Sequence, residues 1–200
     1  MTERCGWAGP EQVYLDYHDT EWGVPEYDSR TLWEKLVLDG FQAGLSWITI
    51  LKKRENFRAA FAGFDPNLIA TWGDAEVERL LQDAGIIRHR GKIEATITNA
   101  RAWQRIEQSD GFDRFLWRYV DGVPLTTTHA DRALIPTQSP LTAQMSKDLK
   151  KAGFKFCGPT IIYAFMEATG LINNHLTTCP QHAACTNFAR DPKEIWPDGL

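Results

Sequence analysis

The chain has 200 residues, of which 43% are hydrophobic and 24% are charged, and its formal net charge is −4. This is the composition of an ordinary globular protein that is long enough to bury a substantial core. The acidic balance excludes a protein that coats nucleic acid through bulk charge, so any nucleic-acid contact must come from a local basic face. The chain has no apolar run near the ~20 residues of a membrane span, no signal-peptide core and no disulfide framework among its four cysteines. We therefore expect a cytoplasmic protein with no membrane partner.

Helix-capping residues mark the first half of the chain. Asp28 or Ser29 can cap a helix with one apolar face. Ser46 follows a glycine-containing break and can cap a longer helix that continues through ENFRAAF. Asp65 followed by Pro66 predicts a short third helix, because proline is favoured at the first helical position.

The second half of the chain is also predicted to be helical. Asp74 opens a helix that Gly85 stops, and from Arg90 apolar residues recur every three or four positions, the pattern of an amphipathic helix. Apolar residues with similar spacing precede Gly153 and Gly170. Because convincing period-2 segments are absent, the sequence predicts an all-α fold of roughly eight helices joined by short loops.

The predicted domain organisation is simple. We expect one domain over residues 1–179, with two helical halves separated by the Pro-, Thr- and Gln-rich segment 126–142. Residues 180–200 have a loop-like composition, and we expect a poorly ordered tail there.

Cysteine and histidine are paired near both ends of the chain. A C-x12-H pair and an H-x3-C pair are formed by Cys5, His18, His175 and Cys179. Two thiolates and two imidazoles complete a tetrahedral zinc shell, and such a closed set is structural, because it leaves no open position for water. Its role would be to tie the chain ends together. Buried cysteines and hydrogen-bonded histidines are an alternative interpretation, and the nearby pair His182 and Cys185 leaves the choice of ligands open.

A glycine-containing hairpin is predicted between the last two long helices. One helix ends at Gly153, the connection FKFCG follows, and a new helix starts near Gly158. This segment resembles the helix-hairpin-helix of DNA-repair glycosylases, in which hairpin amides and a helix N-terminus bind a phosphate. Lys155 adds positive charge there, and the segment GIIRHRGK supplies another basic loop. An ordinary pair of antiparallel helices with a solvated lysine face is the alternative.

Aromatic residues are concentrated in the first 47 positions. Many must belong to the core, since aromatic residues usually do. Their density beside Asp39 and Ser46 also suits a pocket that stacks on a flat ligand, as in enzymes that hold an extruded purine between aromatic faces. The residues are Trp7, Tyr14, Tyr17, Trp22, Tyr27, Trp33, Phe41 and Trp47.

Five long segments make a specific family resemblance. They are RCGW, YHDTEWGVP, QAGLSWITILKKRENFRAAF, DAGIIRHRGKI and GFKFCGPTIIYAFMEATGLINNH, which together span nearly all of residues 4–179. With these segments the chain resembles the bacterial 3-methyladenine DNA glycosylase I family (the constitutive Tag family) of the helix-hairpin-helix glycosylase superfamily. The resemblance implies an all-α fold, excision of N3-methylated adenine from alkylated DNA, and one structural zinc ion per chain. It assigns the zinc to Cys5, His18, His175 and Cys179 rather than to His182 and Cys185.

The resemblance also implies roles for individual residues. It places Asp39 at the position of the catalytic, base-recognising carboxylate, where we expect Glu in the family, so the shorter side chain puts the strength of base recognition in doubt. A surface acid at a helix end is the alternative for Asp39. The implied pocket walls are Trp47, Tyr17, Tyr14, Trp7 and Trp22. The implied DNA contacts are Gly44, Leu45, Lys155, Gly158 and Thr160, with Gly44 and Leu45 filling the gap left by the extruded nucleotide.

The hairpin also bears on the reaction type. Superfamily members that cut the DNA strand carry a lysine nucleophile shortly after the last hairpin glycine, and Thr160 stands at that position here, so no Schiff base should form there. Asn173 and Asn174 stand where many relatives carry a water-activating aspartate. A monofunctional hydrolase is therefore expected, acting as a monomer on duplex DNA and releasing free 3-methyladenine. A non-enzymatic DNA-binding module and a hydrolase with a catalytic metal are the competing interpretations.

Overall fold

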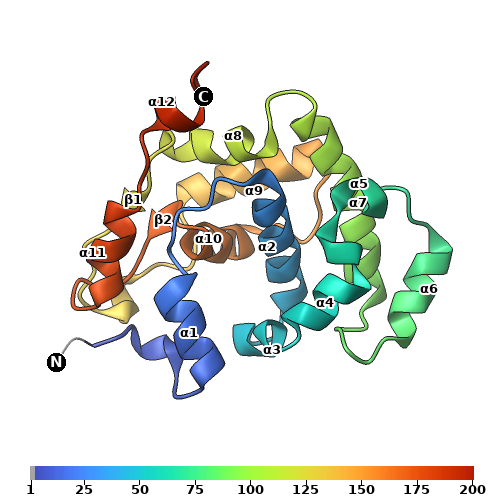
Figure 1. The fold of residues 1–200 in the computed structure, drawn as a ribbon, viewed down its shortest axis with the longest axis horizontal. Helices are drawn as coiled ribbons and strands as arrows, with labels where there is room; N and C mark the ends of the chain where they lie inside the picture. Colours follow the sequence, from blue (N-terminus) through green and yellow to red (C-terminus); the bar gives the residue numbers. More distant parts are fainter. Residues whose placement is uncertain (1–2) are drawn as a thin grey trace.

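The computed structural model describes residues 3–200 and is mostly helical, which confirms the predicted fold class (Figure 1). Within this range no helix combines the length and the apolar character needed to cross a bilayer. The longer helices are α1 (Gln12–Thr20), α2 (Ser29–Gln42), α6 (Asp74–Gln82), α7 (Arg90–Glu107), α9 (Pro140–Ala152), α10 (Pro159–Ala168) and α11 (Pro180–Asn187). The shorter ones are α3 (Trp47–Leu51), α4 (Arg54–Ala60), α5 (Pro66–Ile69), α8 (Phe112–Trp117) and α12 (Pro192–Ile195). Four 3-10 turns are η1 (Gly6–Ala8), η2 (Ala62–Phe64), η3 (Arg118–Val120) and η4 (Arg132–Leu134).

Local caps fix the predicted helix starts. The Asp28 carboxylate accepts from the backbone N–H of Thr31 at 2.8 Å and begins α2, and Asp65 caps α5 with proline at its first position. The helix predicted from Ser46 is divided into α3 and α4. Ser46 does not cap the backbone there, because its hydroxyl lies 2.8 Å from that of Thr49 instead.

Two central helices carry the pocket described below. Helix α10 packs against both α9 and α2, and Figure 1 shows α2 and α10 near the middle of the molecule. Their apolar faces join one core, in which Trp33, Phe41 and Phe165 are almost completely buried. The two helices are therefore rigid supports for the polar side chains that they carry.

A short pair of strands links the two halves of the chain. Strand β1 (Leu125–Thr126) pairs in parallel with β2 (Ile172–Asn173), with Leu125 opposite Ile172. Two-residue strands leave no alternating pattern in a sequence, so they were not predicted. The pairing holds the segment after α8 against the segment after α10, immediately before His175.

The tail differs from the loop that its composition predicts. It forms α11 and α12, each with proline in its first turn, and Trp196 is only 2% exposed. The Trp196 indole donates to the Asp113 carboxylate at 2.7 Å, and its ring lies 5.8 Å from that of Tyr27. The prediction of a loop-like tail was therefore wrong, because helices form over residues 180–187 and 192–195 and Trp196 is buried.

Candidate functional site

The predicted metal-binding residues meet in one buried cluster, here called the Cys2His2 cluster. One donor atom from each residue lies within 4.8 Å of all the others, and all four residues are buried. The Cys5 sulfur lies 3.6 Å from His175 Nδ1, and the Cys179 sulfur lies 3.7 Å from His18 Nε2. The cluster connects the start of the chain and α1 to the segment between β2 and α11. It can hold a metal ion.

Surrounding contacts orient both imidazoles toward the cluster. His18 Nδ1 lies 2.8 Å from the Asp19 carboxylate, and His175 Nε2 lies 2.9 Å from the carbonyl of Trp22. Such partners fix the tautomer of a metal-binding histidine and leave the other ring nitrogen free for the metal. Gly23 allows this approach, because a Cβ atom there would lie 2.8 Å from His175 Nε2.

Burial disfavours a free thiolate in the cluster. Burial, as the largest cause, raises the pKa of the Cys5 thiol to about 11. A thiolate in this position therefore needs a nearby positive charge, which a bound metal ion supplies. The alternative pair is separate from the cluster, since His182 Nε2 lies 2.7 Å from the carbonyl of Thr127 and Cys185 does not belong to the set of four.

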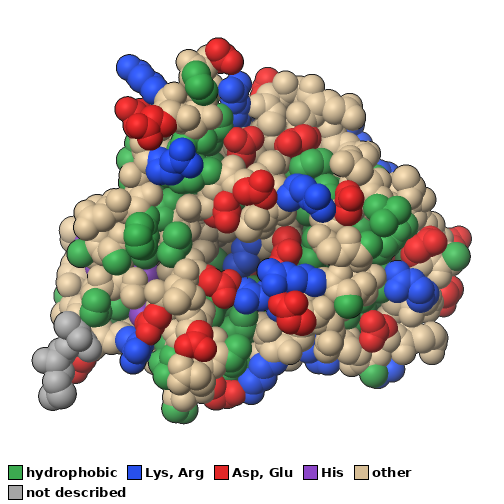
Figure 2. All heavy atoms as spheres, in the orientation of Figure 1, with side chains coloured by type: hydrophobic (Ala, Val, Ile, Leu, Met, Phe, Trp, Pro, Cys, Tyr) green, Lys and Arg blue, Asp and Glu red, His purple; other side chains and the backbone are tan. Residues whose placement is uncertain are grey.

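A cavity of about 260 Å³ lies between α1, α2, α3 and α10 and is here called the aromatic pocket. Its lining includes all the predicted wall residues, namely Trp7, Tyr14, Tyr17, Trp22 and Trp47, and the predicted carboxylate Asp39. Figure 2 shows a hollow near the centre of this face, with acidic and basic side chains around it. The structure therefore brings together side chains that lie up to forty positions apart, and the size of the cavity suits one flat heterocycle.

Aromatic rings line the pocket in two groups. The Tyr17 and Trp47 rings have centroids 5.4 Å apart and a tilt of 44°. Trp7 lies 5.1 Å from Tyr14 and 4.9 Å from Trp22, both in edge-on geometry. These separations are those of stabilising aromatic pairs, so the rings support one another and hold their faces in fixed positions.

Asp39 is a wall residue rather than a surface acid. It is 3% exposed and forms an ion pair with Lys35, one turn earlier on α2, whose Nζ also lies 4.1 Å from the centre of the Trp47 ring. Burial raises the pKa of Asp39 and lowers that of Lys35, while the attraction between them opposes both shifts. Oδ2 of Asp39 and the indole Nε1 of Trp47 are buried with no hydrogen-bond partner. Buried polar atoms are usually paired, and because Asp39 and Trp47 line the pocket, a ligand or water that enters it can supply a partner.

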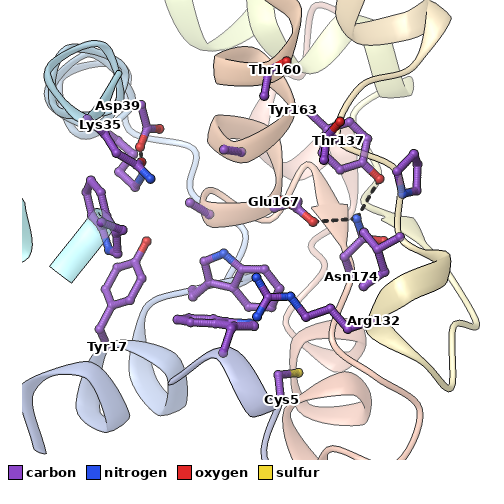
Figure 3. Close-up of a pocket in the computed structure, with 18 of the residues that line it drawn as sticks. Cys5, Tyr17, Lys35, Asp39, Arg132, Thr137, Thr160, Tyr163, Glu167 and Asn174 are labelled. Carbon is purple, nitrogen blue, oxygen red and sulfur yellow. Dashed lines mark hydrogen bonds and ion pairs between the residues drawn. The ribbon is translucent and has the colours of Figure 1, made fainter. Parts of the chain in front are cut away.

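Further polar side chains, which the sequence did not single out, face the same cavity. Figure 3 shows Lys35 beside Asp39 on α2, and Glu167 on α10 hydrogen-bonded to Asn174. Burial, as the largest cause, raises the pKa of Glu167 to about 7. A spacing of three and four positions along α10 was the available signal, since Thr160, Tyr163 and Glu167 share one face of a mostly apolar helix.

The predicted probing loop follows α2. Gly44 has a positive φ of 81°, and Leu45 is 41% exposed. The buried Lys92 ammonium supports this turn by donating to the carbonyls of Phe41 at 2.9 Å and Ala43 at 2.7 Å. The loop is therefore held firmly at its base while its apolar tip is exposed.

The predicted hairpin is also formed. Gly153 ends α9 with a φ of 105°, Gly158 caps α10, and Lys155 is exposed between them. The side-chain amide of Asn99 pins this turn, since its Oδ1 accepts from the N–H of Lys155 at 2.8 Å and its Nδ2 donates to the Lys155 carbonyl at 3.0 Å. Thr160 is the second residue of α10 and lines the aromatic pocket.

Comparison with known proteins places this chain in a family. The family model for methyladenine glycosylase matches residues 7–182. The chain is 54% identical over 178 residues to DNA-3-methyladenine glycosylase 1 of Escherichia coli, covering 88% of this chain and 95% of that protein. It also resembles the crystal structure of a 3-methyladenine DNA glycosylase I, with a TM-score of 0.88, 56% identity and coverage of 89% of this chain and 98% of the other.

A second solved relative contains a ligand. It is a tyrosine-to-phenylalanine variant of 3-methyladenine DNA glycosylase I in complex with 3-methyladenine, 41% identical to this chain, with a TM-score of 0.88 and coverage of 91% of this chain and 98% of the other. The match of the family model over most of the chain, the high identity and the shared fold agree. The chain belongs to the methyladenine glycosylase family.

Proposed function

We propose that this protein is a DNA-3-methyladenine glycosylase that hydrolyses the N-glycosidic bond of 3-methyladenine in alkylated DNA. The observation that carries the proposal is a cavity walled by aromatic rings and by the Asp39 carboxylate, in a chain of the methyladenine glycosylase family. An extruded purine offers what this cavity lacks, namely a flat ring to stack and polar edge atoms to bond.

The lesion itself supplies much of the driving force. N3-methylation makes adenine cationic, so the base leaves as a neutral molecule. Aromatic faces stabilise a cation through their ring quadrupoles by ~0.5–2 kcal/mol each, depending on desolvation. We assign stacking to Trp47 and Tyr17 and the rest of the wall to Tyr14, Trp7 and Trp22.

Asp39 is assigned the edge contact and the catalytic role. Its Oδ2 can accept a hydrogen bond from the amino group of the purine, and the part of its charge that Lys35 leaves unbalanced opposes the positive charge that develops on the sugar. Its short side chain is fixed by the ion pair with Lys35 on the same helix. We infer that this rigidity compensates for the shorter reach compared with a glutamate.

Two exposed features are assigned to the DNA duplex. Leu45, with Gly44, enters the gap left by the extruded nucleotide, since its apolar tip is exposed on a supported turn. Lys155 and the N-terminus of α10 at Gly158 bind a backbone phosphate, and the hydroxyl of Thr160 lies next to them. These contacts position the enzyme without carrying information about the base.

The reaction is assigned to water rather than to an amine of the enzyme. Thr160 has no amine to form an imine, so we infer a hydrolase that leaves the DNA strand intact. A monomer with one catalytic domain over residues 1–179 suffices for this chemistry, because a single chain supplies every residue assigned to the site.

We propose that the Cys2His2 cluster binds one structural zinc ion per chain. Tetrahedral zinc with ordinary Zn–S and Zn–N bonds separates sulfur from nitrogen by about 3.6 Å. The separations of 3.6 and 3.7 Å between the cysteine sulfurs and the histidine nitrogens fit that value. When bound, zinc would stabilise the junction between the chain ends, and four protein ligands leave no coordination position for substrate.

One assay tests the function against its competitors. We expect purified protein to release free 3-methyladenine from alkylated duplex DNA. A DNA-binding module would bind the duplex and release no base. A hydrolase with a catalytic metal would lose activity at once on chelation, before the protein unfolds.

A further inference from the structure

Asp39 alone does not supply a free negative charge for a cationic base in the aromatic pocket. The Asp39 carboxylate is already in an ion pair with Lys35, whose ammonium also lies 4.1 Å from the centre of the Trp47 ring. The pair is therefore close to neutral before any base enters. A cationic purine brings one more positive charge beside Lys35, and like charges at short range in a poorly solvated site repel each other strongly. Another negative group in the pocket would therefore strengthen the binding of a cation beyond what the aromatic faces supply.

Glu167 is the other carboxyl group that lines this pocket. Its Oε1 accepts from the side-chain amide of Asn174 at 2.8 Å, and the same amide nitrogen donates to the Tyr163 hydroxyl at 2.8 Å. Among residues 3–200 no cationic side chain forms an ion pair with Glu167. The amide of Asn174 thus orients this carboxyl group without offsetting its charge (Figure 3).

The charged groups around Glu167 act from three directions. Lys35 and Asp39 act from α2 with opposite effects on its pKa, and Arg132 acts from η4. Arg132 also lines the pocket, but its side chain is exposed, so solvent and salt screen its charge more than they screen the charge of a buried side chain. Burial, the largest cause, raises the pKa of Glu167 to about 7. A neighbouring cation favours the ionised form, so an entering cationic base should lower the pKa of Glu167, which then loses its proton to solvent.

We propose that Glu167 is the counter-charge of the pocket, which makes the enzyme select cationic purines over neutral ones. This proposal rests on the proposed function and adds a residue that determines specificity. Asp39 supplies the hydrogen bond to the base edge. Glu167 supplies negative charge, because the ion pair with Lys35 largely balances the charge of Asp39. After the glycosidic bond breaks, the departing base is neutral and loses this attraction, which favours its release.

The proposal predicts where the kinetic effect falls. Attraction between Glu167 and the base is already present in the bound substrate, because the lesion is cationic before the bond breaks. This attraction does not grow in the transition state, where the positive charge only moves from the base towards the sugar, so its loss raises KM and does not lower kcat. A residue needed only for folding would instead reduce the amount of active enzyme and lower the apparent kcat.

The direct test compares a cationic and a neutral ligand of similar shape. The probes are 3,9-dimethyladeninium, whose charge is fixed, and adenine, each titrated by tryptophan fluorescence near pH 8. Glu167→Gln keeps the shape and an oxygen for Asn174 but removes the charge. We expect it to weaken binding of the cation about 10-fold or more, and to change adenine binding by less than about 2-fold. Equal effects on the two ligands, or no effect on the cation, would overturn the proposal.

The pH profile supplies a second measurement. The wild-type affinity for the cation should fall as the pH decreases from about 8 to about 6, through the pKa of Glu167, and the Gln variant should be flat over this interval. The matched control is Glu55→Gln, which removes the same charge from an exposed position on α4 and should change neither ligand's affinity. If Glu55→Gln has the same effect as Glu167→Gln, net charge rather than the pocket is responsible and the proposal is wrong.

Stability provides the check on folding. A carboxyl group whose pKa is raised in the folded state costs stability at a pH above its unfolded value, because ionisation then opposes burial. Glu167→Gln should therefore unfold near pH 8 at the wild-type temperature or higher. Excision by the wild type separates the two proposals. A wild-type protein that releases no 3-methyladenine refutes the proposed function. Normal release by the wild type, together with unaltered ligand selectivity in Glu167→Gln, refutes only the role of Glu167.

Discussion

Lys35 and Asp39, one turn apart on α2, form an ion pair in the wall of the aromatic pocket that leaves the second carboxylate oxygen of Asp39 without a partner. Burial of an ion pair is costly unless the remaining polar atoms are bonded. The unpaired oxygen of Asp39 suits a binding site in which a ligand completes the hydrogen bonding.

The role of Asp39 is tested by Asp39→Asn, which keeps the shape and removes the charge. We expect excision of 3-methyladenine to slow about 10- to 100-fold, the difference between a charge-assisted and a neutral contact, while duplex binding changes much less. The measurements are single-turnover base release and duplex affinity on the same preparation. Excision at the wild-type rate would show that the carboxylate has no catalytic role, and departure of the base would then depend on the aromatic walls and the lability of the lesion.

Trp47 is expected to supply a stacking face. Trp47→Ala should lose most of its affinity for free 3-methyladenine, in line with the ~1–3 kcal/mol of a lost stacking contact. Isothermal titration with the free base measures this change. Unchanged affinity would mean that the base binds against the other aromatic group, around Trp7 and Trp22.

Lys155 provides the matched contrast, because it is exposed on the hairpin and does not line the pocket. Lys155→Ala should bind free 3-methyladenine like the wild type but bind all duplexes more weakly, with a salt-dependence slope smaller by roughly 0.9. A loss of free-base binding in this variant would contradict the division between phosphate contacts and base recognition.

The metal prediction concerns the identity of the ligands. Elemental analysis should find about one zinc per chain in the wild type and little in Cys179→Ala, whose melting temperature should fall because metal binding is coupled to folding. His182→Ala and Cys185→Ala should retain the metal, since neither side chain is part of the Cys2His2 cluster. Metal lost from these two variants but kept in Cys179→Ala would show that the ligand assignment is wrong.

The absence of an imine-forming residue at Thr160 is also testable. Borohydride treatment of the enzyme with damaged DNA should trap no covalent adduct. The pocket does contain one lysine, Lys35, whose amine could in principle react with the sugar. Its ammonium is held in an ion pair with Asp39, so we expect no adduct there either. A trapped adduct that disappears in Lys35→Met or in Lys155→Ala would identify the nucleophile and contradict the monofunctional assignment.

Features set by local sequence were predicted well. Asp28 and Asp65 cap the helices that their positions indicate, and Gly153 ends α9, because each depends on contacts within a few residues. The Cys2His2 cluster was predicted from two spaced pairs, but its preference over His182 and Cys185 required the family resemblance. The division of the helix after Ser46 was not predicted, because its sequence has no proline or glycine at the break.

Features that depend on tertiary packing were missed. Glu167 and Lys35 were not predicted as site residues, because only the packing of α2 against α10 places them in one cavity. The order of the tail likewise depends on Trp196 packing against Trp117 and Tyr27, which are far away in the sequence. Long-range burial of this kind leaves no periodic signal in the segment itself.

The most direct test of the proposed function is the release of free base from methylated duplex DNA, followed by chromatography, with and without a chelator. The account predicts that 3-methyladenine is released, that the DNA strand stays uncut, and that brief chelation leaves the rate unchanged while the protein remains folded. No release of 3-methyladenine by folded, zinc-containing protein would contradict it.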